Sequence, residues 1–214
     1  MRIRINGVYA PITFVSDTTV HFQCPALDPG VTLEMVMEYE AAPSIAPGAA
    51  AATAIVTVAP VVVKMSDATP GLYLIKGTQA AVLIAGTGFV AGPPPSGLPG
   101  ERYAARPAVA GEYLEIYANG MGAANEALAP GQSAPLDHLI TLVGRVTAVF
   151  GDGQKAPAVF AGLTPGSVGL FQINVQVPEG TRIGDAIPLY IELTREDGSV
   201  VRSNTATIAV SVGR

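Results

Sequence analysis

The sequence repeats itself, and this repeat constrains the fold more than any other feature of the chain. Segments from the first third of the 214 residues return in the same order near the end, with one insertion near residues 162–169. The matching pairs are 10–14 (APITF) with 156–160 (APAVF), 20–25 (VHFQCP) with 173–178 (INVQVP), 35–39 (MVMEY) with 189–193 (LYIEL), and Ile55 with Ile208. Self-similarity of this kind predicts two copies of one fold unit.

Each copy is built from runs that are typical of β-strands. Short stretches rich in β-branched and aromatic residues, such as 20–24 and 171–177, are bounded by Gly, Pro, Asn or Asp. Asn6-Gly7 and Asp197-Gly198 are dipeptides that favour tight hairpin turns. No window of helical length shows a sustained apolar stripe at the i, i+3, i+4 spacing of an amphipathic helix. The sequence therefore predicts an all-β protein with two Ig-like antiparallel β-sandwich modules.

The two copies differ in what precedes them. The second copy follows a long segment with strand-like runs of its own, notably 111–119, whereas only nine residues precede the first copy. We therefore expect the first module to lack its opening strands. The predicted domains are a first, incomplete module at 1–60, a connector with a β-hairpin and a Pro/Gly loop at 61–107, and a second module at 108–214.

An incomplete sandwich leaves a sheet edge and part of an apolar face open, and open edges recruit partners. The connector hairpin at 79–91 is apolar, so we expect it to fold back over the first module. A homodimer formed by a symmetric contact or by strand exchange is the alternative. The repeat also predicts that Phe14 and Phe160 are equivalent core residues. Cys24 takes the place of Val177, so we expect a buried and unreactive thiol.

Five motifs extend this pattern over the chain. They are 6–11 (NGVYAP), 20–25 (VHFQCP), 70–73 (PGLY), 111–122 (GEYLEIYANGMG) and 160–175 (FAGLTPGSVGLFQINV). Together they closely resemble the Solibacter-type C-terminal domain family. The resemblance implies an Ig-like sandwich, related in style to IPT/TIG domains, at the end of a large exported acidobacterial protein. It therefore implies an extracytoplasmic location, secreted or at the cell surface. The family has no established activity, so no catalytic residue is carried over.

Charge and composition exclude several classes of function. The net charge is −5 with 12 Lys and Arg and no basic cluster, so nucleic acid is not an expected partner. The one cysteine allows neither an internal disulfide nor a multi-thiolate metal site. Residues 41–63 carry no charge, but prolines interrupt them and their alternation suits a strand, so we expect no membrane span. No apolar run follows the N-terminal arginines, so we expect any export signal to lie outside this chain.

No group of residues forms a catalytic or metal-binding pattern, so we expect no enzyme activity, no cofactor and no metal site. His21 and His138 are the only histidines, and neither has a second histidine at ligand spacing. Alternation with Val20 and Phe22 places His21 on the solvent side of its strand. A single calcium ion held between the modules by carboxylates of separate loops stays open as an alternative.

Tyr103, Tyr113 and Tyr117 are the candidates for ligand contact, because carbohydrate-binding sandwiches offer exposed aromatic rings and this chain has no Trp. Tyr113 and Tyr117 share one strand face, and we expect at least one of them in the core. The expected function is that of a non-catalytic structural or adhesive module, with upstream domains of its parent protein as partners. The alternative is an accessory module that binds a glycan or a surface protein through the loops near these tyrosines.

Overall fold

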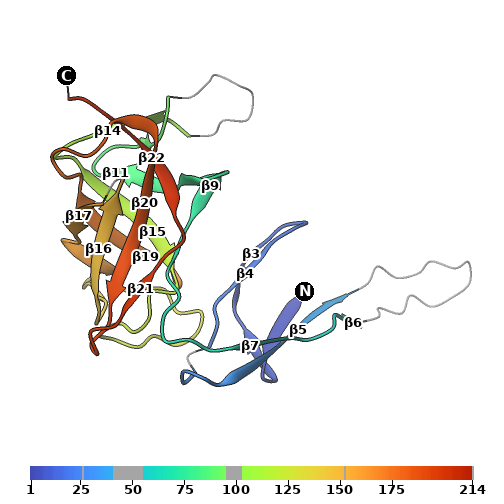
Figure 1. The fold of residues 1–214 in the computed structure, drawn as a ribbon. Coiled ribbons are helices and arrows are strands. Elements are labelled where there is room, and N and C mark those ends of the chain that lie inside the picture. The colour runs from blue at the N-terminus through green and yellow to red at the C-terminus, as the bar shows by residue number, and fades with distance from the viewer. Residues whose placement is uncertain (26, 41–54, 95–102, 152, 214) are drawn as a thin grey trace, which may run out of the picture. The chain divides into compact units, whose positions relative to one another are not determined.

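The computed structural model describes residues 1–214 except 26, 41–54, 95–102, 152 and 214 (Figure 1). The protein is all-β, as the sequence predicts, because every regular element in the described ranges is a strand. The strands group into two compact units. Unit 1 contains Met1–Asp67 with Leu128–Gln132, and unit 2 contains Ala68–Ala127 with Ser133–Arg214.

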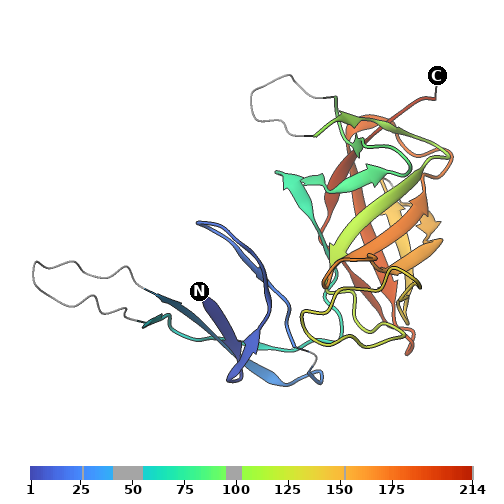
Figure 2. The same cartoon turned by 180° about the vertical axis from the view of Figure 1, so that it is seen from behind.

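Unit 2 consists of two sheets, which Figures 1 and 2 show as facing layers. One sheet has the order β17-β16-β20-β22-β10-β9, with β14 also paired to β22 and β21 to β20. Its strands are β9 (Leu74–Lys76), β10 (Gln79–Ala80), β14 (Ala108–Val109), β16 (Arg145–Phe150), β17 (Gln154–Pro157), β20 (Gly184–Thr194), β21 (Val200–Arg202) and β22 (Ala206–Ser211). The other sheet has the order β13-β12-β11-β15-β19-β18, with β8 also paired to β15. Its strands are β8 (Gly71–Leu72), β11 (Val82–Ile84), β12 (Val90–Ala91), β13 (Ala105–Arg106), β15 (Tyr113–Asn119), β18 (Phe160–Leu163) and β19 (Phe171–Gln176).

The core of unit 2 lies between these sheets and follows from strand alternation, which turns every second side chain inward. Ile116 and Ile173 from one sheet and Leu189 and Ile208 from the other are fully buried in the same apolar cluster. Phe150 is the largest of the fully buried side chains. Burial of each large side chain of this kind contributes roughly 1.5–3 kcal/mol, so the shared core holds the two sheets together.

Unit 1 is a smaller β-structure with the same kinds of pairing. Its main sheet has the order β2-β1-β5-β6, with β7 also paired to β5, and β3 and β4 form a separate two-stranded sheet. The strands are β1 (Arg2–Ile5), β2 (Val8–Ala10), β3 (Ile12–Val15), β4 (Val20–Phe22), β5 (Thr32–Glu40), β6 (Ile55–Thr57) and β7 (Val61–Lys64). Among its described residues, the apolar cluster contains four buried ones, Ile3, Ile5, Ala10 and Leu33.

The turn between β1 and β2 confirms one local prediction. Asn6 and Gly7 both have positive φ, at 49° and 82°, as a tight hairpin turn demands. Asn6 Oδ1 also accepts a hydrogen bond of 2.8 Å from the backbone N–H of Glu34. The dipeptide therefore closes the first hairpin and ties it to β5.

The pairing of the strands shows that unit 1 repeats the last seven strands of unit 2 in chain order. Ile3 of β1 lies opposite Ala10 and Met37. In unit 2, Ala148 of β16 lies opposite Ala156 and Ile191, which are the repeat partners of Ala10 and Met37. Both routes through the repeat thus identify β1 with β16, β2 with β17 and β5 with β20.

The same comparison covers the remaining strands. Phe14 of β3 lies opposite His21 of β4, and Phe160 of β18 lies opposite Asn174 of β19. The last two strands of each copy pair with the same long strand: β6 and β7 with β5, and β21 and β22 with β20. The predicted match of Ile55 with Ile208 is wrong by one strand, because Ile208 corresponds to Val63 of β7.

The division of the chain differs from the expected bounds of 1–60, 61–107 and 108–214. The strands between residues 71 and 106 form part of unit 2, where β10 pairs with β22 and β11 pairs with β15. The hairpin at 79–91 therefore covers the core of unit 2, and the expectation that it folds back over the first module is wrong. Part of the Pro/Gly loop lies outside the described residues.

The strands supplied by residues 68–119 explain why equivalent positions of the two units differ in burial. Val61 and Val63 are 49% and 48% exposed, whereas their counterparts Ala206 and Ile208 are 0% exposed. In unit 2, β10 and β14 pair with the free edge of β22. Within the described residues of unit 1, nothing pairs with the corresponding edge of β7.

Three single-residue predictions are wrong. Phe14 is 50% exposed, and Phe160 is half-buried and stands outside the core cluster of unit 2. Cys24 is exposed, although its repeat partner Val177 is buried. Val177 is covered because its N–H donates to the carbonyl of Glu112, at the start of β15, and the described part of unit 1 has no such strand.

In the described ranges no helix is long and apolar enough to cross a membrane. The uncharged segment 41–63 falls partly outside those ranges, and its described part contains β6 and the start of β7.

Candidate functional site

The outer face of β15 carries two of the three tyrosines that the sequence singles out. Strand alternation buries Leu114 and Ile116 and turns Tyr113, Glu115 and Tyr117 to the opposite face. Tyr113 is 45% exposed and Tyr117 is half-buried. The expectation that one of these tyrosines lies in the core is therefore wrong.

Strand β19 places a row of amide side chains beside these residues. Tyr113 lies opposite Gln176, Glu115 opposite Asn174, and Tyr117 opposite Gln172. Directly opposed residues on neighbouring antiparallel strands lie on one face of the sheet, so aromatic rings, a carboxylate and amides share a surface. We call these six residues the β15–β19 face.

Hydrogen bonds fix several side chains of the β15–β19 face. Gln172 Nε2 donates to Asn174 Oδ1 at 2.9 Å, and Gln176 Nε2 donates to the carbonyl of Gly111 at 2.9 Å. The Tyr117 hydroxyl donates to Glu115 Oε2 over a longer distance of 3.4 Å. Desolvation raises the pKa of Tyr117, and the nearby Glu115 carboxylate adds to the shift. The phenol therefore stays protonated at neutral pH and keeps its donor.

Tyr103 lies apart from the other two tyrosines in the sheet. It precedes β13, and β12 and β11 stand between β13 and β15. Tyr103 is half-buried. The structure thus brings Tyr113 and Tyr117 together on one strand, whereas Tyr103 lies near β13, the strand at the edge of the same sheet.

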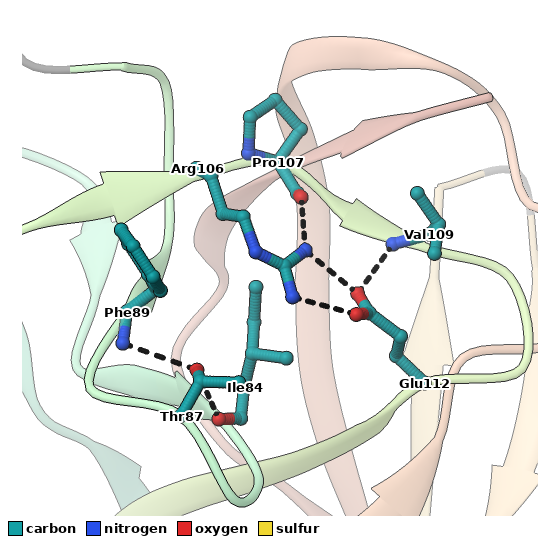
Figure 3. A network of polar contacts seen from close by, with 7 residues as sticks. All are labelled: Ile84, Thr87, Phe89, Arg106, Pro107, Val109 and Glu112. Carbon is teal, nitrogen blue, oxygen red and sulfur yellow. Dashed lines mark hydrogen bonds and ion pairs between the residues drawn. The ribbon is translucent and has the colours of Figure 1, made fainter. Parts of the chain in front are cut away.

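An ion pair that sequence reasoning missed holds the start of β15 in place (Figure 3). Arg106 donates two hydrogen bonds to the Glu112 carboxylate, at 2.6 and 3.0 Å, and a third to the carbonyl of Pro107 at 3.1 Å. The N–H of Val109 donates to the same carboxylate at 2.9 Å. These bonds lower the pKa of Glu112, with the bond from Arg106 as the largest cause.

The guanidinium of Arg106 also lies 5.8 Å from the centre of the Phe89 ring. Phe89 is held by a turn in which its N–H donates to the Thr87 hydroxyl, and that hydroxyl donates to the carbonyl of Ile84 (Figure 3). The sequence contains one signal of this network: Arg106 and Glu112 carry opposite charges six residues apart, with the turn at Gly111 between them. The network fixes the register at which β15 enters the sheet.

Unit 1 has an open apolar hollow of about 450 Å³. It is lined by Met1, Arg2, Ile3, Tyr9, Ala10 and Ile12. In unit 2 the counterparts of Ile3 and Ala10 are Ala148 and Ala156, which are buried in a core shared with residues of β8–β15. The inward residues Ile3 and Ala10 form one part of the lining, and Arg2 and Tyr9, which alternate with them along β1 and β2, form another part.

The two histidines differ in their surroundings. His21 is exposed, as its strand position predicts, and its ring centre lies 5.2 Å from that of Phe14. His138 contacts Glu126 at 2.9 Å and Asp137 at 3.0 Å, and these hydrogen bonds, Glu126 first, raise its pKa. In the described part of the chain no cluster of three or more His, Cys, Asp or Glu side chains could hold a metal ion.

Comparisons with protein-family models, with curated protein sequences and with solved structures find no match to this chain.

Proposed function

We propose that the chain is a non-catalytic structural or adhesive segment of a larger exported or cell-surface bacterial protein, built from Ig-like units. The observation that carries this proposal is the strand-for-strand repeat of β16–β22 in β1–β7. A chain that repeats one β-unit fits a structural or adhesive role, because repeated units can build extended surfaces. The resemblance to the Solibacter-type C-terminal domain supports the exported location.

A second candidate function is favoured by the β15–β19 face. Aromatic rings stack on the apolar faces of sugar rings, and amide and carboxylate groups hydrogen-bond sugar hydroxyls. Tyr113, Asn174 and Gln176 supply these groups on one rigid sheet surface. This arrangement fits a weak carbohydrate- or protein-binding accessory module.

A glycan array and a panel of hydrolase substrates, both applied to the purified chain, separate these functions. The structural or adhesive role predicts no turnover and no specific glycan signal. Binding that is lost in Tyr113→Ala and kept in Tyr190→Ala, a half-buried tyrosine of the other sheet, would favour the accessory module. Turnover abolished by a single substitution would contradict both proposals.

A further inference from the structure

Strand β4 in unit 1 is the counterpart of β19, but the two strands have different neighbours. In unit 2, β19 lies between β18 and β15 and pairs with both. Among the described residues, β4 pairs with β3 alone. One edge of β4 therefore has the position that β15 fills in unit 2.

The side chains around that position are apolar and incompletely buried. Val20 and Phe22 of β4 are half-buried, whereas their counterparts Ile173 and Val175, which lie beside β15 in the sheet, are fully buried. Ile3, which lines the hollow of unit 1, and the exposed Val61 of β7 lie on the same, inner side of the unit, since both lie opposite inward residues of β5. The open edge and the open apolar face thus belong to one surface.

We propose that unit 1 accepts an added β-strand from a partner polypeptide segment outside these 214 residues. The segment runs antiparallel to β4 and carries apolar side chains at alternate positions, as β15 does beside β19. Backbone hydrogen bonds to β4 hold the segment, and its apolar side chains enter the space above the buried residues of unit 1. This interaction goes beyond the proposed role as a structural or adhesive segment.

The chemistry of the partner segment comes from β15 itself. Leu114, Ile116 and Ala118 are fully buried, and polar or aromatic residues alternate with them. Strand β15 cannot serve unit 1 as well, because it pairs with β19 on one edge and with β11 on the other. A second copy of unit 1 would offer β4 or β7 as the added strand. Neither of these is the counterpart of β15, the strand that fills this position in unit 2, so we assign the position to a different segment.

The repeat fixes the register of the added strand. In unit 2, Leu114 lies opposite Val175 and Ile116 opposite Ile173. The equivalent residues of a bound strand therefore lie opposite Phe22 and Val20. The residue in the place of Glu112 lies beside Cys24, because the carbonyl of Glu112 accepts the N–H of Val177.

This register allows a test with the chain's single cysteine. Three synthetic peptides of residues 111–119 are incubated with the full chain in a glutathione redox buffer, and disulfides to Cys24 are counted by intact mass. The first peptide carries Glu112→Cys, which places its thiol beside Cys24. The second carries Asn119→Cys, which places its thiol roughly 20 Å away along the strand. The third combines Glu112→Cys with Leu114→Glu and Ile116→Glu, which removes the apolar pattern.

We expect the first peptide to react at least about tenfold faster than the other two, because binding raises the local thiol concentration. Equal rates for all three peptides would overturn the proposal, since Cys24 would then react only by random collision. A concentration-dependent dimer in light scattering, with Cys24 protected from every peptide, would also overturn it and assign the surface to a second copy of the chain. The peptides change no residue of the protein, so misfolding of a variant cannot produce either result.

Discussion

Substitution of two equivalent residues measures how incomplete unit 1 is. Ile208 of β22 and Val63 of β7 have the same place in the repeat, but Ile208 is 0% exposed and Val63 is 48% exposed. Ile208→Ala removes three buried carbons, worth about 2.4 kcal/mol at about 0.8 kcal/mol each. The cavity left in the rigid core raises the expected loss of unfolding free energy to about 3–4 kcal/mol.

Val63→Ala removes two carbons that are half in water already, so the expected loss is about 0.8 kcal/mol, with no closed cavity. Urea titrations read by pulsed hydrogen exchange and mass spectrometry follow peptides from each unit separately and give both values. Equal destabilisation of unit 1 by Val63→Ala and of unit 2 by Ile208→Ala would contradict the difference in burial between the two positions. That result would mean that something covers β7 in solution.

Three further predictions concern single residues. Glu192 is buried between Lys155 and Arg202, at 2.7 and 2.8 Å, and these partners, Lys155 first, lower its pKa. Above about pH 4.3, Glu192→Gln should therefore lower the unfolding free energy by about 1 kcal/mol. This difference between the two proteins should vanish as the pH falls through the lowered pKa, and urea titrations at a series of pH values measure it. Gly162→Ala would place a Cβ against the carbonyl oxygen of Ile140 and should lower the unfolding free energy by about 2–3 kcal/mol. The control Gly88→Ala, whose Cβ would lie in open space, should lower the unfolding free energy by under about 1 kcal/mol. The Cys24 thiol should react with a thiol reagent without denaturant, and faster as the pH rises, because partial burial raises its pKa; a thiol that needs denaturant would contradict its exposure.

The sequence predicts the strands and the repeat because both depend on local patterns. Period-two alternation and the Asn6-Gly7 turn are readable from neighbouring residues, and the structure has strands at both copies of each matched block. The unit boundary is not readable in this way. Strands β8–β13 have two or three residues each, and β10 pairs with β22 across more than a hundred residues of chain, so only the tertiary fold assigns them.

The β15–β19 face could be predicted in part. Alternation along 113–117 places Tyr113 and Tyr117 on one side, and the charge of Glu115 between them already indicates the outer side. The amides of β19 could not be placed beside them, because the register of two strands more than fifty residues apart depends on the whole sheet. The buried repeat partner Val177 suggests burial of Cys24, but Cys24 is exposed because burial depends on neighbouring strands as well as on the residue.

Native-state hydrogen exchange of the unmodified chain tests most directly whether unit 1 is a copy of β16–β22 without the strands of residues 68–119. We expect strong protection of the β19 and β22 amides, because both strands pair on two edges. In β4 and β7, which each pair on one edge within the described part of the chain, we expect exchange at least about tenfold faster. Equal protection of β4 with β19 and of β7 with β22 would contradict the account, because the edges of unit 1 would then be covered in the isolated chain.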